Sequence, residues 1–352
     1  MIRFILRRLA YGGLVLIAVV SIISAIIYLA PVDPTRLTFG QRADAATVEA
    51  KQNELGLNAP LYLQLLWYLN DVSPISVHQD SPEAHAKYRY ARVLRLGQGT
   101  IVFKKPYLRE SFQYGRKVSQ MIAEAVPYTI ILALAAILLA SIVGIFLGII
   151  AALRPRSWFD HSAVVVSVIG ISLPSYVSAM ILALIFGFYL QHYTGLNIQG
   201  SLLVLDDYGD ERIVWRNLLL PAIALGIRPI AIITQLTRSA MLDVLSQDYI
   251  RTAKAKGLSF YKVVFKHALR NALNPVVTAI SGWFAALLAG AFFVENVFGY
   301  KGLGKLTVDA LLTFDIPLVL GAVLCVATFF VLLNILVDIA YAWLDPRVGK
   351  RE

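Results

Sequence analysis

Long apolar runs, separated by shorter polar segments, are the main feature of the chain. Six of them reach the roughly 20 residues that a helix needs to cross the hydrocarbon core of a membrane, which is about 30 Å thick. Lipid offers no hydrogen-bonding partners to bare backbone, so we expect each run to form a membrane-spanning helix. Five runs carry no charged residue, and the fourth carries only Arg228. The runs cover residues 9–30, 125–153, 162–190, 217–237, 272–294 and 316–337.

The first run has an alternative interpretation as a secretory signal peptide, because Arg3, Arg7 and Arg8 precede it. Its length exceeds the roughly 7–15 apolar residues of a signal-peptide core, and no A-x-A-like cleavage site follows it. We therefore expect an uncleaved first span.

Composition agrees with a membrane protein. Hydrophobic residues make up 58% of the 352 residues and charged residues only 15%, and the mean hydropathy is +0.68. Soluble domains carry nearer a quarter of charged residues, so an ordinary cytosolic enzyme and a disordered or collagen-like chain are excluded. The single cysteine, Cys325, excludes a disulfide framework and a multi-cysteine metal site.

The net charge of +10 follows membrane topology rather than nucleic-acid binding. Basic residues gather in segments 1–8, 154–161, 238–271 and 345–352, whereas the short loops that alternate with them carry few. By the positive-inside rule, these four segments and both termini are predicted to be cytoplasmic. The long loop 31–118 carries both signs, and long loops cross the membrane largely regardless of charge.

This outer loop is too long to be a bare connector. Residues 45–55 have a composition that favours a helix, and Pro60 begins a second, amphipathic stretch. Residues 71–95 are polar and contain two prolines, which predicts an irregular insertion. The amphipathic stretch places Leu61, Leu65, Leu66 and Leu69 at helical spacing, with Tyr62, Trp67 and Tyr68 suited to a membrane interface.

Small residues recur along the second run. Ala136, Ala140, Gly144 and Gly148 are spaced four residues apart, which predicts that another helix approaches closely along this stripe. A second outer loop, 191–216, holds an acidic cluster that we interpret as a solvated loop tip.

The polar segment between the fourth and fifth runs, residues 237–275, is the most informative part of the chain. It is too polar to enter lipid and too long for a simple turn. Asp248 is predicted to cap a short helix, and Gly257 to end it with a turn. Three basic residues then recur at four-residue spacing on a second helix, namely Lys262, Lys266 and Arg270.

We therefore predict a helix–glycine–helix hairpin that projects from the membrane as a docking element. The alternative is a solvated cytoplasmic loop whose basic side chains reach along its surface to water.

At this point the sequence resembles the cytoplasmic coupling motif, often called the EAA loop, of ABC-importer permeases. The general motif reads E-A-A-x-x-x-G, then nine residues, then I-x-L-P. Arg251, Thr252 and Ala253 occupy the first three positions, Gly257 falls on the glycine, and residues 267–270 replace the I-x-L-P end. These departures resemble the R-T-A-x-A-K-G and H-x-L-R-N-A variant of the B-type permease in the dipeptide, oligopeptide and nickel group.

Other segments resemble the same family, and the resemblance covers nearly the whole chain except residues 71–95. These segments are the N-terminal I-L-R-R-L, residues 55–58 with 60–62, 219–221, 236–239, 297–304 and 344–347.

The resemblance implies an all-α integral membrane protein with the ABC type I importer permease fold, six transmembrane helices, and cytoplasmic N- and C-termini. Residues 1–30 would hold the cytoplasmic N-terminus and the first span, and residues 31–118 a long periplasmic or extracellular loop with short helices. Residues 119–352 would form the permease core, which includes the coupling segment 241–271.

The resemblance also implies partners. A second homologous permease, two cytoplasmic ABC ATPases, an extracytoplasmic substrate-binding protein and membrane lipid are expected, and nucleic acid is not. No cofactor is expected in this chain, because ATP and Mg²⁺ belong to the ATPase subunits, whose closure would push the coupling segment. The residues that the resemblance assigns to ATPase coupling are Tyr249, Arg251, Thr252, Ala253, Lys254, Ala255, Lys256, Gly257, Leu258, His267, Arg270 and Asn271.

Arg228 is the one charge inside a predicted span. Such a charge is costly in lipid and indicates a bundle interior or a water-filled path, so we hypothesise that it faces the substrate pathway and meets a substrate carboxylate. The alternatives are a structural pair with a carbonyl or with an acid of the partner permease, or a helix end that reaches water. Pro229 beside it predicts an irregular helix.

Nucleotide binding and catalysis by this chain are not expected. Residues 299–305 resemble the start of a phosphate-binding loop, but Leu306 stands where that motif needs Ser or Thr, and the segment follows a span on the outer side. The histidines are dispersed, and no metal site or nucleophilic triad has the required spacing.

The sequence thus predicts a non-catalytic, inner-membrane permease subunit of an ATP-driven importer of di- or oligopeptides. The same architecture serves nickel chelates and some oligosaccharides, and no residue separates these cargoes. Two alternatives from other classes are a proton-coupled secondary transporter, which would show inverted repeats and buried mid-membrane acids, and a membrane anchor without transport.

Overall fold

The chain divides into two compact units. One comprises Met1–Ala125 and Leu306–Val331, and the other Val126–Lys305 and Leu332–Glu352. The helix expected at residues 45–55 lies outside the described residues. The computed structural model describes residues 2–29, 58–79, 81–96, 99–206 and 208–344.

In the first unit, two long apolar helices match the first and sixth predicted runs. They are α1 (Ile2–Leu29) and α15 (Ile316–Leu344). The last residues of α15, from Leu332 on, belong to the second unit. Val20 of α1 is buried in a cluster with apolar side chains of α15. A Cβ on Gly12 would lie 2.5 Å from Cγ1 of Val331, so α1 and α15 touch closely at this point.

The described part of segment 31–118 contains the predicted amphipathic helix and also a small sheet. The prediction of an irregular insertion at residues 71–95 is wrong, because the segment forms a short helix and two strands, which pair antiparallel with a third strand just after it in the order β1-β3-β2. The elements are α4 (Leu61–Val72), β1 (Ile75–His78), α5 (Pro82–Tyr88), β2 (Ala91–Leu96) and β3 (Gly99–Phe103).

Polar side chains around Asp71 hold this small domain together. Its carboxylate accepts hydrogen bonds from the Tyr88 hydroxyl and from Nε of Arg109, each at 2.8 Å, and the Lys104 ammonium donates to its carbonyl. Since these partners come from α5 and from the segment that follows β3, one buried acid joins parts of a region whose polar composition indicated no core.

The aromatic residues of α4 separate into two groups. Tyr62 and Trp67 keep 63% and 46% of their surface accessible, in keeping with the interfacial place predicted for them. Tyr68 is fully buried, and the Arg109 guanidinium lies 5.4 Å from its ring centre, so the interfacial prediction for Tyr68 is wrong.

The second unit contains the remaining long helices. Helix α6 begins in the first unit and continues into this one, and α14 begins in this unit and continues into the first. The elements are α6 (Val118–Leu153), α7 (Trp158–Ser172), α8 (Ser175–Leu182), the π-helical η1 (Ala183–Tyr189), α9 (Gln191–Thr194), β4 (Leu203–Leu205), β5 (Glu211–Ile213), α10 (Arg216–Leu245), α11 (Asp248–Ala255), the π-helical η2 (Lys262–Ala268), α12 (Leu269–Gly290), α13 (Phe292–Val297) and α14 (Leu303–Leu312).

The third predicted span is not a straight helix. It breaks between α7 and α8, which with η1 forms a second arm at 106° to the first. Leu173 is extended at the break because the ring of Pro174 disfavours helical backbone in the residue before it. The described residues therefore hold five straight helices that could cross a membrane, or six spans if this bent pair is counted as one.

Two other predictions about the spans change in detail. The fifth span runs from Lys262 to Leu288 rather than over residues 272–294, and the short α13 follows it. Helix α10 continues through Pro229, where an irregular helix was predicted.

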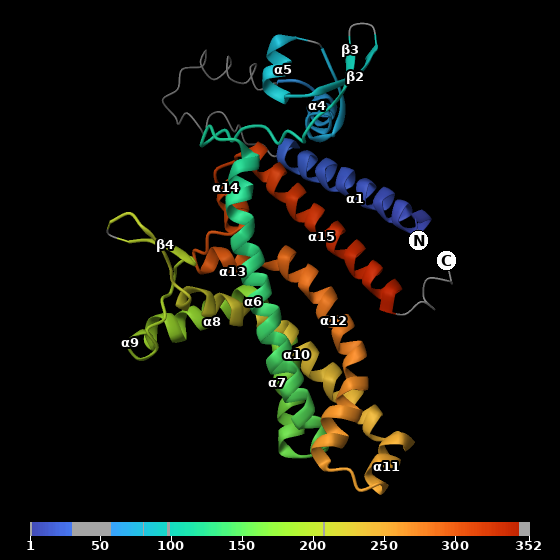
Figure 1. Cartoon of the computed structure of the whole chain (residues 1–352). Coiled ribbons are helices and arrows are strands. Elements are labelled where there is room, and N and C mark those ends of the chain that lie inside the picture. The colour runs from blue at the N-terminus through green and yellow to red at the C-terminus, as the bar shows by residue number, and fades with distance from the viewer. Residues whose placement is uncertain (1, 30–57, 80, 97–98, 207, 345–352) are drawn as a thin grey trace. The chain divides into compact units, whose positions relative to one another are not determined.

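The stripe of small residues on α6 packs against α10, as predicted. Ala136 and Ala140 are fully buried. A Cβ on Gly148 would lie 2.5 Å from Cβ of Thr237 and 2.7 Å from the carbonyl oxygen of Thr234, so only glycine allows this approach. Helix α11 lies at one end of the second unit, and the β4–β5 hairpin and α9 lie toward the opposite end (Figure 1).

Candidate coupling surface

The hairpin predicted between the fourth and fifth spans is present, and its turn is built on a glycine. Gly257 has φ +72°, a left-handed conformation that glycine adopts without strain. Its N–H donates to the Lys254 carbonyl at 3.0 Å, and the Leu258 N–H donates to the Ala253 carbonyl at 3.3 Å. This pair of bonds is the Schellman arrangement that ends a helix at glycine.

One face of α11 is buried against the spans. Ile250 is fully buried and Ala253 nearly so, in a cluster that includes Ile149 of α6, Met241 of α10 and Val264 of η2. The short helix therefore rests on three long helices, which hold it in place.

The other face of α11 and its turn are open. Of the twelve residues predicted to couple, only Ala253 is buried and His267 is partly buried. The remaining ten are exposed: Tyr249, Arg251, Thr252, Lys254, Ala255, Lys256, Gly257, Leu258, Arg270 and Asn271.

The two ends of the predicted motif meet. The side-chain amide of Asn271 on α12 donates to the Tyr249 hydroxyl on α11 at 2.8 Å. Residues 22 positions apart thus form one surface, which we call the coupling surface and define as the exposed residues of 249–258 with Arg270 and Asn271.

The start of α11 differs from the prediction. Gln247 is the residue before the helix and makes no side-chain cap, whereas Asp248 is the first helical residue. There its carboxylate favours the positive end of the helix dipole and lies 3.5 Å from Nη1 of Arg251. Both side chains are largely exposed, so this ion pair contributes little to stability.

A second structural feature links the coupling surface to the span that follows. Residues Lys262–Ala268 form a π-helical stretch, η2, directly continuous with α12. Wider helical turns of this type recur at functional sites. The sequence carries no periodicity signal for it, so it was not predicted.

An ion pair at the same end of the unit joins α7 to α10. Nη2 of Arg238 donates to Oδ2 of Asp160 at 2.8 Å, and Nε donates to Oδ1. The backbone N–H of Arg156 also donates to this carboxylate, at 2.9 Å. Sequence reasoning missed Asp160, although its place three residues after the helix-capping Ser157 was a usable signal.

The glycine-rich segment that mimics a phosphate-binding loop wraps around a carboxylate of this chain. Glu295 is fully buried, and its Oε2 accepts from the backbone N–H of Gly304 at 2.7 Å and of Lys305 at 3.1 Å. Its Oε1 accepts from the Thr129 hydroxyl of α6 at 2.7 Å, and burial raises the Glu295 pKa to about 7. The carboxylate occupies the position an anion would take at the start of α14, which explains the motif without a nucleotide.

Arg228 is exposed on α10, near the middle of the span. The structure does not place it on the coupling surface. Within the described residues, no group of three or more His, Cys, Asp or Glu side chains could hold a metal ion.

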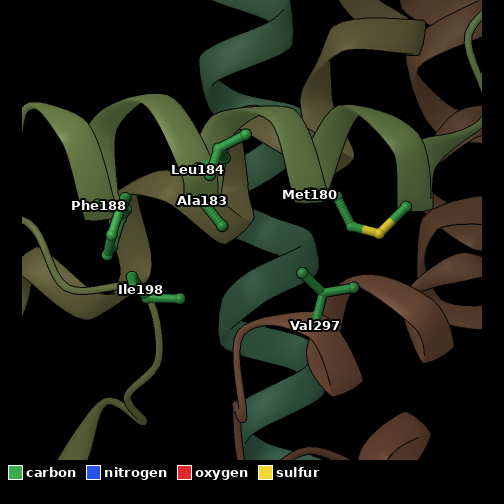
Figure 2. A pocket seen from close by; sticks show the side chains of 6 residues that line it. All are labelled: Met180, Ala183, Leu184, Phe188, Ile198 and Val297. Carbon is green, nitrogen blue, oxygen red and sulfur yellow. The ribbon is translucent and has the colours of Figure 1, made fainter.

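An apolar depression of about 340 Å³ lies beside the bent third span (Figure 2). Six side chains line it, and none is polar: Met180, Ala183, Leu184, Phe188, Ile198 and Val297. Specific ligand sites combine apolar walls with a few polar groups, so this depression is not a candidate for peptide recognition.

Several apolar spans, joined in one place by a supported and exposed hairpin, define a polytopic membrane protein. Comparison with known proteins agrees. Residues 1–133 match the model of the N-terminal part of binding-protein-dependent transport system membrane components, and residues 144–350 match the model of the inner membrane component itself. The chain belongs to this family of binding-protein-dependent transport system inner membrane components.

Relatives align along the full length. The di/tripeptide transport system permease protein DppB of Pseudomonas aeruginosa (strain UCBPP-PA14) is 36% identical over 100% of both chains. The dipeptide transport system permease protein DppB of Escherichia coli (strain K12) is 34% identical, again over 100% of both. The probable D,D-dipeptide transport system permease protein DdpB of the same strain is 34% identical over 98% of this chain and 97% of its own.

Among solved structures, an amino acid ABC transporter with histidines aligns with a TM-score of 0.47 and 12% identity, over 65% of this chain and 94% of its own. The family assignment rests on the sequence matches. The protein is thus an ABC-transporter permease of the inner membrane, and such a permease works with an ATPase and a binding protein.

Proposed function

We propose that this permease imports di- or oligopeptides and that the coupling surface receives the push of a partner ATPase. The observation that carries the coupling role is the supported hairpin: Ile250 anchors α11 to the spans while the residues around Gly257 stay exposed. The peptide cargo is supported by the relatives, whose names specify di/tripeptide, dipeptide and D,D-dipeptide transport.

The proposed topology follows the charge distribution. The coupling segment 241–271 and both termini face the cytoplasm, and the loop 31–118 with its small sheet faces outward. The core, residues 119–352, pairs with a second homologous permease, and one ATPase docks on each. ATP and Mg²⁺ are held by those ATPases, so this chain supplies no catalytic group.

Two alternative cargoes and one alternative mechanism remain as proposals to be tested. Nickel chelates and oligosaccharides would use the same coupling surface. A proton-coupled secondary transporter would need no ATPase, and the anchoring of α11 on three spans favours the coupled mechanism instead.

The direct test reconstitutes the permease with its partner permease, the ATPases and the binding protein in proteoliposomes. We expect dialanine and trialanine to stimulate ATP hydrolysis and to accumulate only when ATP is present. Uptake that persists without ATP and stops with an uncoupler would replace the proposal with secondary transport. ATP-dependent uptake of a nickel chelate or an oligosaccharide, without uptake of peptides, would correct the cargo.

We propose further that Arg228 faces the substrate path and meets the peptide carboxylate. Its exposure in the middle of α10 supports this, because lipid does not tolerate a charge at that depth without cost. We expect the wild-type complex to import dialanine faster than its C-terminal amide, and Arg228→Gln to lose this preference. Arg216→Gln at the end of α10 is the control. An unchanged preference in Arg228→Gln would assign the residue a structural role.

A further inference from the structure

The spans of the second unit expose two chemically different surfaces. Helix α6 exposes large apolar side chains, among them Leu134, Leu138, Ile142 and Phe146 with 50–63% of their surface accessible, and these suit lipid. The described part of α12 exposes only one side chain of that kind, Val277. Its other exposed residues are small or polar: Arg270, Asn271, Asn274, Pro275, Thr278, Gly282 and Ala286.

Packing fixes the orientation of this face. The opposite side of α12 is buried, and Val276 lies in a cluster with Ile233 of α10 and Ala140 of α6. From Asn274 onward, the polar side of α12 therefore lies away from α10 and α6.

The polar face extends into the membrane-spanning part of α12. Arg270 is the last charged residue before the apolar part of the span, and Thr278 lies eight residues beyond it. At about 1.5 Å per residue, this places Thr278 about 12 Å deeper than Arg270 along the helix. Gly282 lies one turn deeper again, and a Cβ there would meet open space.

Arg228 of the neighbouring helix, α10, lies at a depth similar to that of Gly282. Helices α10 and α12 run in opposite directions, because a short hairpin joins them at one end. Their packed cluster joins Ile230 and Leu236 of α10 with Ile280 and Leu273 of α12. Because the two helices are antiparallel, the cluster residues pair in reverse chain order, which sets Ile230 level with Ile280. Arg228, two residues before Ile230, is then level with Ser281 and Gly282, at the deep end of the polar face.

We propose that Asn274 and Thr278 form a contact surface for the main chain of an extended peptide inside the transport path. This proposal rests on the proposed import of peptides. An asparagine amide and a threonine hydroxyl each donate and accept hydrogen bonds, which matches the N–H and C=O groups of a peptide backbone. Neither side chain is charged, so the surface tolerates cargo side chains of either sign, and Gly282 and Ala286 leave room for them.

The competing occupant is a polar face of the second permease. It would bury the same side chains permanently and exclude both water and peptide from them. Accessibility and protection by peptide therefore separate the two.

The first experiment is cysteine labelling, for which the single natural cysteine of the chain is replaced first. In the assembled transporter carrying Cys325→Ser, we introduce Asn274→Cys, Thr278→Cys or Leu138→Cys and add a membrane-impermeant methanethiosulfonate from the cytoplasmic side. We expect labelling at positions 274 and 278, none at 138, and slower labelling when trialanine is present. Absence of labelling at both positions, or labelling that trialanine does not slow, overturns the proposal.

The second experiment compares two threonines whose hydroxyls both donate to the carbonyl four residues earlier. Thr278 is exposed and bonds Asn274 at 3.1 Å, whereas Thr234 is buried and bonds Ile230 at 2.7 Å. Loss of one contact to cargo predicts that Thr278→Val slows trialanine uptake by about 2- to 10-fold while ATPase attachment is retained. Thr234→Val removes the same intrahelical bond and should stay near wild type.

Equal uptake by wild type, Thr278→Val and Thr234→Val overturns the contact surface but leaves peptide import intact. An equal loss in both variants overturns it as well, because the effect would then come from the helix. A wild-type complex that imports no peptide would instead refute the proposed function itself.

Discussion

Replacement of Gly257 is the perturbation that most sharply tests how the coupling surface is built. The residue has φ +72°, and a Cβ added there would meet nothing within 4 Å. Within this chain, a Cβ at position 257 therefore adds backbone strain without a clash. Gly257→Val should show the largest effect, because a β-branched side chain is poorly tolerated in the left-handed region.

The magnitude follows from the cost of that conformation. A non-glycine residue in the left-handed region loses about 1–2 kcal/mol, which corresponds to about a 5- to 30-fold shift in an equilibrium. If the ATPase binds only the native hairpin, its apparent affinity for the permease falls by up to this factor. The loss of ATPase affinity should be smallest for Gly257→Asn, larger for Gly257→Ala and largest for Gly257→Val, because asparagine tolerates the left-handed region best of the three.

The assay is titration of the purified permease complex with the ATPase, followed by stimulated ATP hydrolysis. Gly209→Val is the matched control, because Gly209 has φ +88°, also meets nothing within 4 Å, and lies in the loop between β4 and β5. Its strain should leave ATPase affinity unchanged. Equal affinities for all three Gly257 variants and wild type would refute the reasoning, as would an equal loss in Gly209→Val.

Three further predictions concern packing and charge in the second unit. Gly148→Ala should destabilise the protein by about 1–3 kcal/mol, because the added Cβ would strike α10. Gly13→Ala is the control and should be neutral, because a Cβ there meets nothing within 4 Å. Thermal unfolding in detergent distinguishes the two variants, and equal melting temperatures would contradict the packing. Arg238→Gln should lower stability by about 1.5–3 kcal/mol through the loss of hydrogen bonds to Asp160, and Arg238→Lys, which keeps the charge but not the paired geometry, should fall between it and wild type. The pKa of Glu295 rises from 4.5 to about 7 on folding, so folding takes up a proton between these pH values. The stability of the protein should therefore fall as pH rises from about 4.5 to about 7. This pH dependence should vanish in Glu295→Gln, and a dependence that persists there would belong to another group.

The sequence predicted most of the long helices because their signal is local. Twenty apolar residues in a row define a span whatever surrounds them, and the stripe from Ala136 to Gly148 indicated where a neighbour would pack. The break at Pro174 was also present in the sequence. It was missed because a proline alone does not tell whether a span continues. Pro221 and Pro229, for example, lie within the unbroken α10.

The features that escaped prediction depend on contacts between distant residues. Asp71 binds Arg109 from the segment after the small sheet, and Glu295 is held by Thr129 and Gly304. Nothing in the local pattern links these partners. The hairpin itself was predicted, because the turn at Gly257 and the helices around it lie within one continuous segment, and its coupling role stays a prediction.

Photocrosslinking in the assembled transporter tests the central claim most directly. A benzophenone amino acid replaces Leu258 on the coupling surface or, as the control, Tyr208 in the loop between β4 and β5, which is 91% exposed. We predict an adduct between position 258 and the ATPase, and none between position 208 and the ATPase. An ATPase adduct from position 208, with none from position 258, would contradict the assignment of this hairpin as the coupling element.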